Sequence, residues 1–157
     1  ETHYDQSYSS SCSTSGIASC YATAGMPLYT EKRLNGELIS KAINELGTVT
    51  TYAGGKFAYI KDSYEDSYVF GSDGLSTRVG STHTSSSYDK YGNVTEQVVT
   101  QTNLSDAMEL KTTTTNDYGS DATMLRMGRL LFTTVTKERT GASAISRSLC
   151  FILVNVY

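Results

Sequence analysis

One hairpin signal near the middle of the chain constrains the fold more than any other feature. The flanking residues 77–86 and 96–102 are rich in Thr, Ser and Val, which favour extended backbone over helix. Between them lie Asp89, Gly92 and Asn93, which reverse a chain cheaply, because Gly accepts positive φ and Asx side chains bond nearby backbone. The stretch therefore predicts a β-hairpin whose turn lies within residues 88–93.

Similar segments recur along the rest of the chain. The turn signals are Asn35-Gly36, Gly54-Gly55 and the stretches 71–74, 103–106 and 117–120. Between them we expect a short strand at 2–6 and longer strands at 28–34, 48–52, 57–70, 75–88, 94–102, 108–116, 129–139 and 149–154, with residues 141–148 as a loop. Seven or eight main strands joined by short turns predict an all-β protein of long antiparallel strands and hairpins. They would form an open sheet or a sandwich that needs additional strands to close.

Residues 37–46 give conflicting local signals. Ile39, Ala42, Ile43 and Leu46 follow a helical period, and Gly47 follows them where a helix C-cap would lie. Taken alone, the segment predicts a short helix, although strands are expected on both sides of it.

We divide the chain into three segments: a polar Ser/Gly-rich segment at 1–25, the main β region at 26–140, and an apolar C-terminal strand region at 141–157. The first segment contains Cys12 and Cys20, which could form a disulfide in an oxidising compartment and would leave Cys150 unpaired. Three free thiols are the equal alternative. The cysteine spacing matches no zinc motif.

Composition narrows the classes of partner. The formal net charge is -3, with no cluster of Lys and Arg of the kind that nucleic acid requires. The apolar run 149–154 is far shorter than the ~20 residues of a membrane-spanning helix. Ser- and Thr-rich strands with few charges are typical of secreted and cell-surface β-proteins. The chain begins at Glu1 without a visible signal peptide, so we expect a mature product or a fragment in an extracellular or cell-surface location.

The sequence contains no catalytic signature. His3 and His83 lie in no metal-ligand spacing, and Glu65 and Asp66 would point to opposite faces of a strand. No nucleophile elbow, P-loop or dinucleotide fingerprint occurs. We therefore expect a protein that is not an enzyme and holds neither a cofactor nor a metal.

The two glycosylation sequons and the scattered tyrosines can each be interpreted as functional or as incidental to the fold. Asn93-Val94-Thr95 and Asn103-Leu104-Ser105 are glycosylation sequons, although so many Ser and Thr residues make chance matches common. The scattered tyrosines suit a carbohydrate-binding face, but packing between strands explains them more simply.

The segment Tyr88-Asp89-Lys90-Tyr91-Gly92-Asn93 resembles the repeat unit of the RHS/YD-repeat proteins. Asn116-Asp117-Tyr118-Gly119 partly repeats it. Further landmarks in matching order are 25–28, 57–60, 65–68, 111–118 and 128–136. Together they resemble the region just upstream of the repeat shell in toxin-complex B subunits and SpvB-like secreted toxins, over roughly residues 20–140.

The resemblance implies a structural role without catalysis. In this family long strands form a hollow shell that encloses a toxin segment. Tyr88, Asp89, Tyr91, Gly92 and Asn93, with Asp117, Tyr118 and Gly119, would then be turn and packing residues. The expected partners are flanking shell sequence or other copies of the chain. One clear repeat cannot close a cavity, and residues 143–157 fit nothing expected after the last landmark.

The alternative is an extracellular self-assembling β-subunit, such as a filament or an adhesin. Unpaired strand edges recruit other chains. The apolar C-terminal strand, through Leu149, Phe151, Leu153 and Val154, would then pair with a neighbouring subunit rather than within its own chain. Polymers in solution would favour this alternative, and a monomer that binds or needs flanking RHS sequence would favour the shell.

Overall fold

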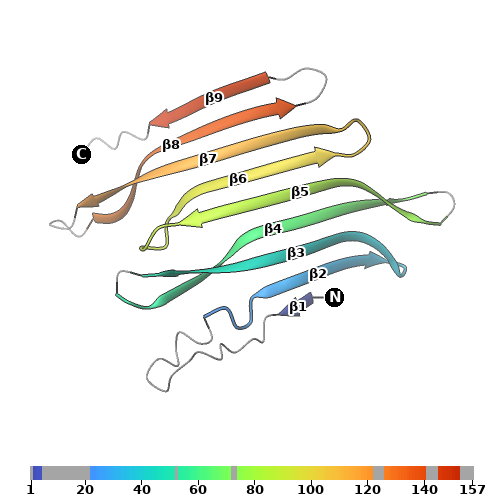
Figure 1. Cartoon of the computed structure of the whole chain (residues 1–157), viewed down its shortest axis with the longest axis horizontal. Helices are drawn as coiled ribbons and strands as arrows, with labels where there is room; N and C mark the ends of the chain where they lie inside the picture. Colours follow the sequence, from blue (N-terminus) through green and yellow to red (C-terminus); the bar gives the residue numbers. More distant parts are fainter. Residues whose placement is uncertain are drawn as a thin grey trace.

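A computed structural model describes residues 2–4, 22–51, 53–71, 74–121, 126–140 and 145–152, and these form one sheet of nine antiparallel strands (Figure 1). The order of the strands in the sheet is their order in the chain, so every strand pairs with its sequence neighbours. The strands are β1 (Thr2–Tyr4), β2 (Pro27–Leu34), β3 (Glu37–Thr50), β4 (Lys56–Phe70), β5 (Ser76–Tyr88), β6 (Val94–Asn103), β7 (Met108–Asp121), β8 (Arg126–Thr140) and β9 (Ile145–Ile152).

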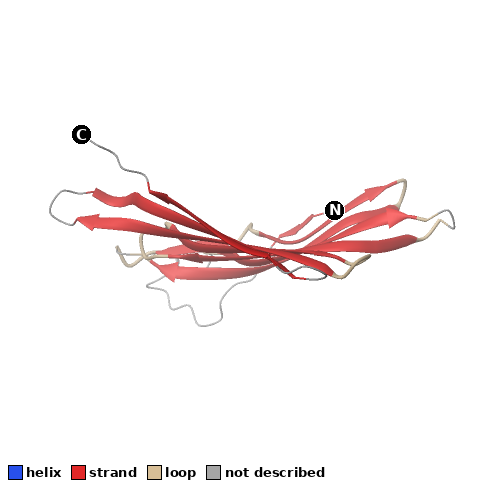
Figure 2. Ribbon diagram, turned by 90° about the horizontal axis from the view of Figure 1, so that it is seen from above, coloured by secondary structure: helices blue, strands red, loops and turns tan. Residues whose placement is uncertain are grey.

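The sheet is a single twisted layer, with no second layer of described residues packed on it (Figure 2). Among the described residues no side chain is less than 2% exposed, and the buried polar residues are Asp62 and Ser86, each 8% exposed. The accessible surface is 10527 Å², whereas a compact monomer of 17.1 kDa is expected to expose about 7,750 Å². Within the described residues, therefore, the sheet contains no fully buried side chain and has no second layer on either face.

The expected fold class is confirmed: the chain is all-β, its long antiparallel strands form hairpins, and the sheet is open. The nine strands comprise the short N-terminal strand and eight main strands, and the sheet draws on all three expected segments. The helix expected from the periodicity of residues 37–46 is wrong. These residues begin β3, which pairs with β2 on one side and with β4 on the other. Two ladders of backbone hydrogen bonds outweigh a weak local preference for helix.

The turn expected at residues 117–120 is also wrong. β7 continues through Asp121, with irregularities in its pairing to β8 on either side of Tyr118 and Gly119. The Leu131 side chain lies against Gly119, where an added Cβ would be 3.3 Å from Leu131 Cδ2. Bulges absorb the Gly-containing segment without reversing the chain. Asp117, Tyr118 and Gly119 are thus strand residues, and the second copy of the repeat seen in the sequence is no second turn.

Three turns of the sheet have the same backbone geometry. The sequence indicated these turns only by their glycines. Three successive hairpins, at 51–55, 71–75 and 89–93, share one hydrogen-bond pattern. The first residue donates its N–H to the carbonyl of the fifth, over 2.8–3.0 Å, and its own carbonyl accepts from the N–H of the fourth, over 2.9–3.1 Å. The fourth residue is always a glycine at positive φ: Gly54 (81°), Gly74 (75°) and Gly92 (85°). The chain therefore repeats one hairpin unit from β3 to β6.

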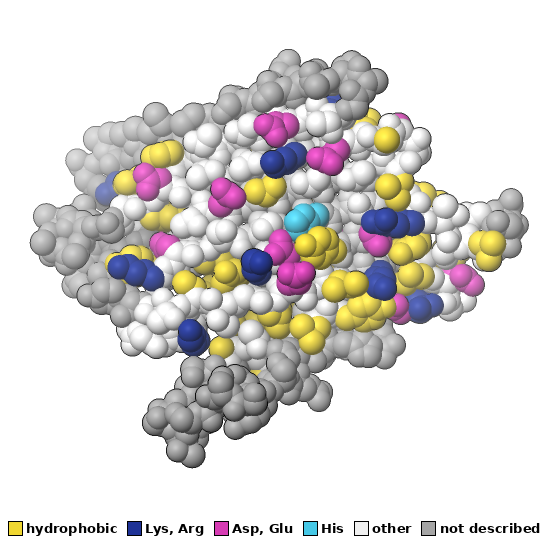
Figure 3. Space-filling model, in the orientation of Figure 1, with side chains coloured by type: hydrophobic (Ala, Val, Ile, Leu, Met, Phe, Trp, Pro, Cys, Tyr) yellow, Lys and Arg dark blue, Asp and Glu magenta, His cyan; other side chains and the backbone are white. Residues whose placement is uncertain are grey.

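Between β3 and β7 the pairing register separates a charged face from a neutral face, because directly paired antiparallel residues share a side of the sheet. On the flanking strands the neutral side carries the cations Lys32, Lys137 and Arg139. The rows through Ser81, His83, Ser85 and Ser87 contain the charged and titratable side chains Lys41, Glu45, Asp62, Asp66, His83, Glu96, Glu109 and Lys111. The rows through Thr82, Thr84 and Ser86 between β3 and β7 contain Ala42, Asn44, Ser63, Gln97, Val99, Gln101, Leu110, Thr112 and Thr114, with Glu65 as their single charge. Figure 3 shows a face on which charges of both signs and a histidine are in view.

The C-terminal strand pairs within its own chain. β9 lies beside β8, with Leu149 opposite Val135 and Phe151 opposite Thr133. Residues 145–148, expected to be loop, belong to this strand because β8 offers them a complete ladder of partners. The outer side of β9 is one end of the strand order, and β1 is the other end. Leu153 and Val154 lie outside the described residues, as do Cys12 and Cys20.

Candidate functional site

The turn between β5 and β6 is built around the Asp89 carboxylate. Its Oδ1 accepts the backbone N–H of Tyr91 at 2.8 Å and that of Asn93 at 2.9 Å, and its Oδ2 accepts the Asn93 side-chain amide at 2.9 Å. Together with Gly92 at positive φ, these contacts fix the five-residue turn. Asp89, Gly92 and Asn93 are thus the residues that form this turn.

Electrostatics agree with this geometry. Partial burial alone would raise the pKa of Asp89, but hydrogen bonds from the Asn93 side chain and from the backbone of Asn93, Tyr91 and Gly92 outweigh it. The pKa of Asp89 therefore lies below its ordinary value of 3.8. The Asn93 side-chain nitrogen, to which a glycan would be attached, donates a hydrogen bond to this carboxylate.

A cluster on the charged face brings together residues that sequence reasoning left apart. His83 of β5 lies directly opposite Tyr64 of β4, and their rings stack with centroids 4.4 Å apart and an interplanar angle of 2°. The His83 Nε2 is 2.9 Å from the Asp62 Oδ1. Asp62 is buried, and the Lys61 Nζ is 3.4 Å from its Oδ2.

Asp62 is held as a carboxylate. Burial acts to raise its pKa, but hydrogen bonds from His83, Ser85 and Lys61 outweigh burial and lower the pKa below 3.8. A carboxylate that orients an imidazole is also a component of acid–base catalysis. Here the only hydrogen-bond partner of the His83 ring in the described part of the chain is Asp62, and both hollows described below lie elsewhere. The arrangement supports a satisfied cross-strand cluster that holds β4 to β5.

The other carboxylates also pair across strands. Glu65 and Asp66 do lie on opposite faces: Glu65 accepts the Ser40 hydroxyl at 2.8 Å, and Asp66 pairs with Arg78 at 2.6 Å. No group of three or more His, Cys, Asp or Glu residues within the described ranges is arranged to hold a metal ion.

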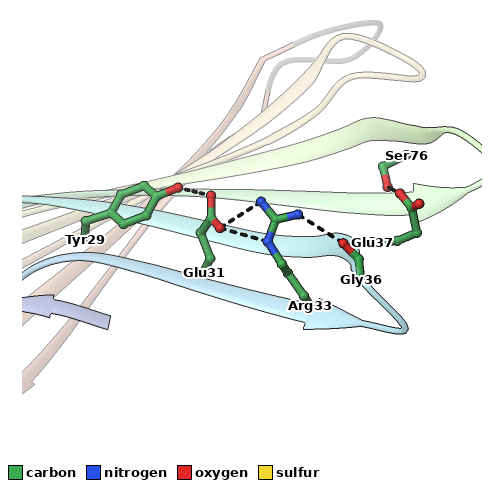
Figure 4. A network of polar contacts seen from close by, with 6 residues as sticks. All are labelled: Tyr29, Glu31, Arg33, Gly36, Glu37 and Ser76. Atoms are coloured by element: carbon green, nitrogen blue, oxygen red, sulfur yellow. Dashed lines mark hydrogen bonds and ion pairs between the residues drawn. The ribbon is translucent and has the colours of Figure 1, made fainter. Parts of the chain in front are cut away.

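A polar network ties the exposed β2–β3 hairpin together (Figure 4). The Tyr29 hydroxyl donates to Glu31, and the Arg33 guanidinium is 2.8 Å from Glu31 and 3.1 Å from the Gly36 carbonyl. The hydrogen bonds from Tyr29 and then Arg33 lower the pKa of Glu31. The Arg33 contacts are exposed, and the contacts among Tyr29, Glu31, Arg33 and Gly36 join near neighbours in sequence, so they order the hairpin.

Three aromatic rings, those of Phe57, Tyr59 and Tyr88, pack together beyond the last residue pair of β4 and β5. The Tyr59 and Tyr88 ring centroids are 4.5 Å apart, and Phe57 lies 5.4 Å from Tyr88. Tyr59 also lies over Gly47 on β3, where an added Cβ would be 2.9 Å from the ring. Tyr88 of β5 therefore packs against aromatic side chains of β4.

Two hollows in the described part of the sheet are lined mainly by residues of the neutral face, the first also by Ser81 and Thr102. One, of about 440 Å³, is lined in part by Thr82, Gln101 and Leu110. The other, of about 510 Å³, is lined in part by Ser63, Thr84 and Ser86, together with the aromatic rings. No Lys, Arg, His, Asp or Glu side chain lines either hollow.

The described residues include no helix long and apolar enough to cross a membrane. Comparison with known proteins adds no relative: the chain matches no protein-family model, no curated protein and no solved structure.

Proposed function

We propose that this chain is a structural, non-catalytic segment of an RHS/YD-repeat secreted protein, forming part of a toxin-encapsulating β-shell. The observation that carries the proposal is the single-layer meander of nine strands, in which each strand pairs with its chain neighbours. Such a sheet presents two open ends in its strand order, at β1 and β9, where further strands of the same kind would continue the ladder.

The repeated turn supports the same role. Residues 51–55, 71–75 and 89–93 form successive hairpins on one pattern, and the third contains the Tyr88–Asn93 unit on which the family resemblance rests. Repeat architectures are built from one supersecondary unit that cannot bury its apolar surface alone. The large exposed surface of this chain is what an isolated portion of such an architecture would have.

The polar cluster on β4 and β5 also supports a structural role. The Asp62–His83 pair lies on an open strand face rather than in either hollow. The function proposed for it is to hold strands together, with secretion and cargo enclosure inferred from the family resemblance.

The alternative, an extracellular self-assembling subunit, is favoured by one specific observation. β9 offers an eight-residue outer edge of largely apolar sequence at the end of the sheet. Edge-to-edge pairing of copies through that strand would give a filament rather than a closed assembly.

Light scattering and electron microscopy of the purified 157-residue chain separate the two roles. A shell segment is expected to remain a monomer, because its edge strands would pair with flanking shell strands rather than with other copies of the chain. Polymers that lengthen with protein concentration, and that are blocked by a proline in β9 at Leu149, would overturn the shell proposal and favour the filament.

A further inference from the structure

The pairing between β4 and β5 stops before either strand ends. Its last residue pair is Asp62 with Ser85. Residues 56–61 of β4 and 86–88 of β5 therefore have no described partner across the resulting split, which we call the fork. On their other sides the same strands stay paired, β4 with β3 and β5 with β6. Figure 1 shows β4 bending away from β5 at this end of the sheet.

The fork leaves backbone groups without partners inside the sheet. Along a strand, the N–H and C=O groups of successive residues point alternately to the two neighbouring strands. In residues 56–61 and 86–88, the groups that point into the fork have no backbone hydrogen bond to any described residue. Such an edge recruits a further extended chain, because half-buried backbone groups need partners. Unlike the outer edges at β1 and β9, this one has a strand on either side of it.

The hollow of about 510 Å³ lies at the fork and is lined from both sides of it. β4 contributes Tyr59 and Ile60, and β5 contributes Thr84 and Ser86. Ser86 is only 8% exposed, so the hollow reaches a buried hydroxyl. From the rise, spacing and thickness of a sheet, one strand residue fills about 160 Å³. The hollow is therefore large enough for about three extended residues.

The chemistry of the fork favours a polypeptide as its occupant. Alternating N–H and C=O groups at strand spacing are matched by the backbone of another extended chain, as in recognition by strand addition. No Lys, Arg, His, Asp or Glu side chain lines the hollow, so a charged residue there would lose its hydration without gaining a counter-charge. The Tyr59 and Tyr88 rings, with centroids 4.5 Å apart, offer apolar contact, and the Thr84 and Ser86 hydroxyls offer hydrogen bonds.

We propose that the fork binds an uncharged, extended segment of another polypeptide, which inserts as an additional strand between β4 and β5. Backbone hydrogen bonds along residues 56–61 hold the segment, and its side chains contact the aromatic rings and hydroxyls of the hollow. This binding site is independent of the shell role, because that role concerns the outer edges at β1 and β9. The two can therefore succeed or fail separately.

A capped, fluorescently labelled peptide with the sequence of residues 130–136 is the probe, because this segment is uncharged and extended in β8. It is titrated with the 157-residue chain, and binding is followed by fluorescence anisotropy. A second peptide of the same sequence, with its backbone amides N-methylated, lacks the donors that strand pairing requires. Hydrogen exchange of the chain with and without the first peptide then locates the bound strand.

Two threonines of one cross-strand row provide matched variants. Thr84 and Thr112 are both paired with Val99, but Thr84 lines the hollow at the fork, whereas Thr112 lines neither hollow. Thr84→Lys would place an ammonium group in the hollow, and Thr112→Lys adds the same group outside it. Circular dichroism verifies the sheet in both variants.

The expected result is saturable binding of the first peptide, with slower exchange of amides within residues 56–61 and 86–88. N-methylation of the peptide and Thr84→Lys should each weaken binding about tenfold or more, and Thr112→Lys should bind as the wild type does. Should Thr84→Lys fail to fold, Ser63→Lys places the same charge in the hollow. No saturable binding overturns the proposal, as does protection confined to β1 or β9, equal binding of the two peptides, or equal effects of the two matched variants.

Discussion

The Asp89 turn gives the sharpest stability prediction. Asp89→Ala removes the acceptor of three hydrogen bonds, those from the Tyr91 N–H, the Asn93 N–H and the Asn93 side-chain amide. At about 1 kcal/mol for each bond to a partly exposed group, the variant should lose about 2–3 kcal/mol of unfolding free energy. Asp89→Asn keeps one acceptor oxygen and should lose about 1 kcal/mol, because the bonds are no longer charge-assisted.

The assay is urea unfolding followed by circular dichroism, with the slope of free energy against denaturant compared between variants. Asp106→Ala is the matched control, since Asp106 lies in the β6–β7 turn and accepts a single exposed bond, from the Met108 N–H at 3.1 Å. Its loss should be about 0.5–1 kcal/mol. If Asp89→Ala costs no more than Asp106→Ala, the carboxylate does not organise the turn and the reasoning is refuted.

Three further predictions concern the turn and strand glycines and the carboxylates of Asp62 and Asp89. Gly54→Ala and Gly92→Ala should each cost about 1–2 kcal/mol in the same urea assay, because an added Cβ meets no atom within 4 Å and only the positive φ is penalised; unequal losses would count against a shared turn. Gly47→Ala should cost about 1–3 kcal/mol for a different reason, since its Cβ would lie 2.9 Å from the Tyr59 ring, and Tyr59→Leu should relieve most of that loss. Asp62 and Asp89 have pKa values below 3.8 in the folded chain, so their contribution is complete above that pH and is lost as pH falls through the folded values. The Asp62→Asn, Asp89→Asn double variant should therefore lose less stability than the wild type between about pH 5 and about pH 2 in urea titrations, and equal losses would contradict the assignment.

The sequence predicted most hairpins correctly, because the conformation of a short Gly- and Asn-containing turn depends mainly on the residues of the turn itself. Asn35 and Gly36 both adopt positive φ, at 52° and 89°, as the type I′ turn between β2 and β3 requires. The errors at 37–46 and 117–120, like the loop expected at 145–148, have one cause. In each segment neighbouring strands supply backbone partners that local preference cannot reveal.

The candidate cluster depended on register, which the sequence does not provide. Counting back from the Phe70–Ser76 pair without interruption would place Thr82 opposite Tyr64. An irregularity between Ser67 and Tyr68 shifts the pairing by one residue and places His83 there instead. A one-residue shift exchanges the faces of a strand, so the Asp62–His83 contact could not be derived from spacing alone.

Hydrogen exchange tests most directly the central claim, that this is an open single-layer sheet in which each strand is held by its neighbours. The account predicts a gradient: amides of β4 to β7 are protected most, and protection falls stepwise toward β1 and β9, with the outward-facing amides of β9 exchanging fastest. Uniform protection across all nine strands, lost in one cooperative step, would contradict it, because that behaviour requires a shared core.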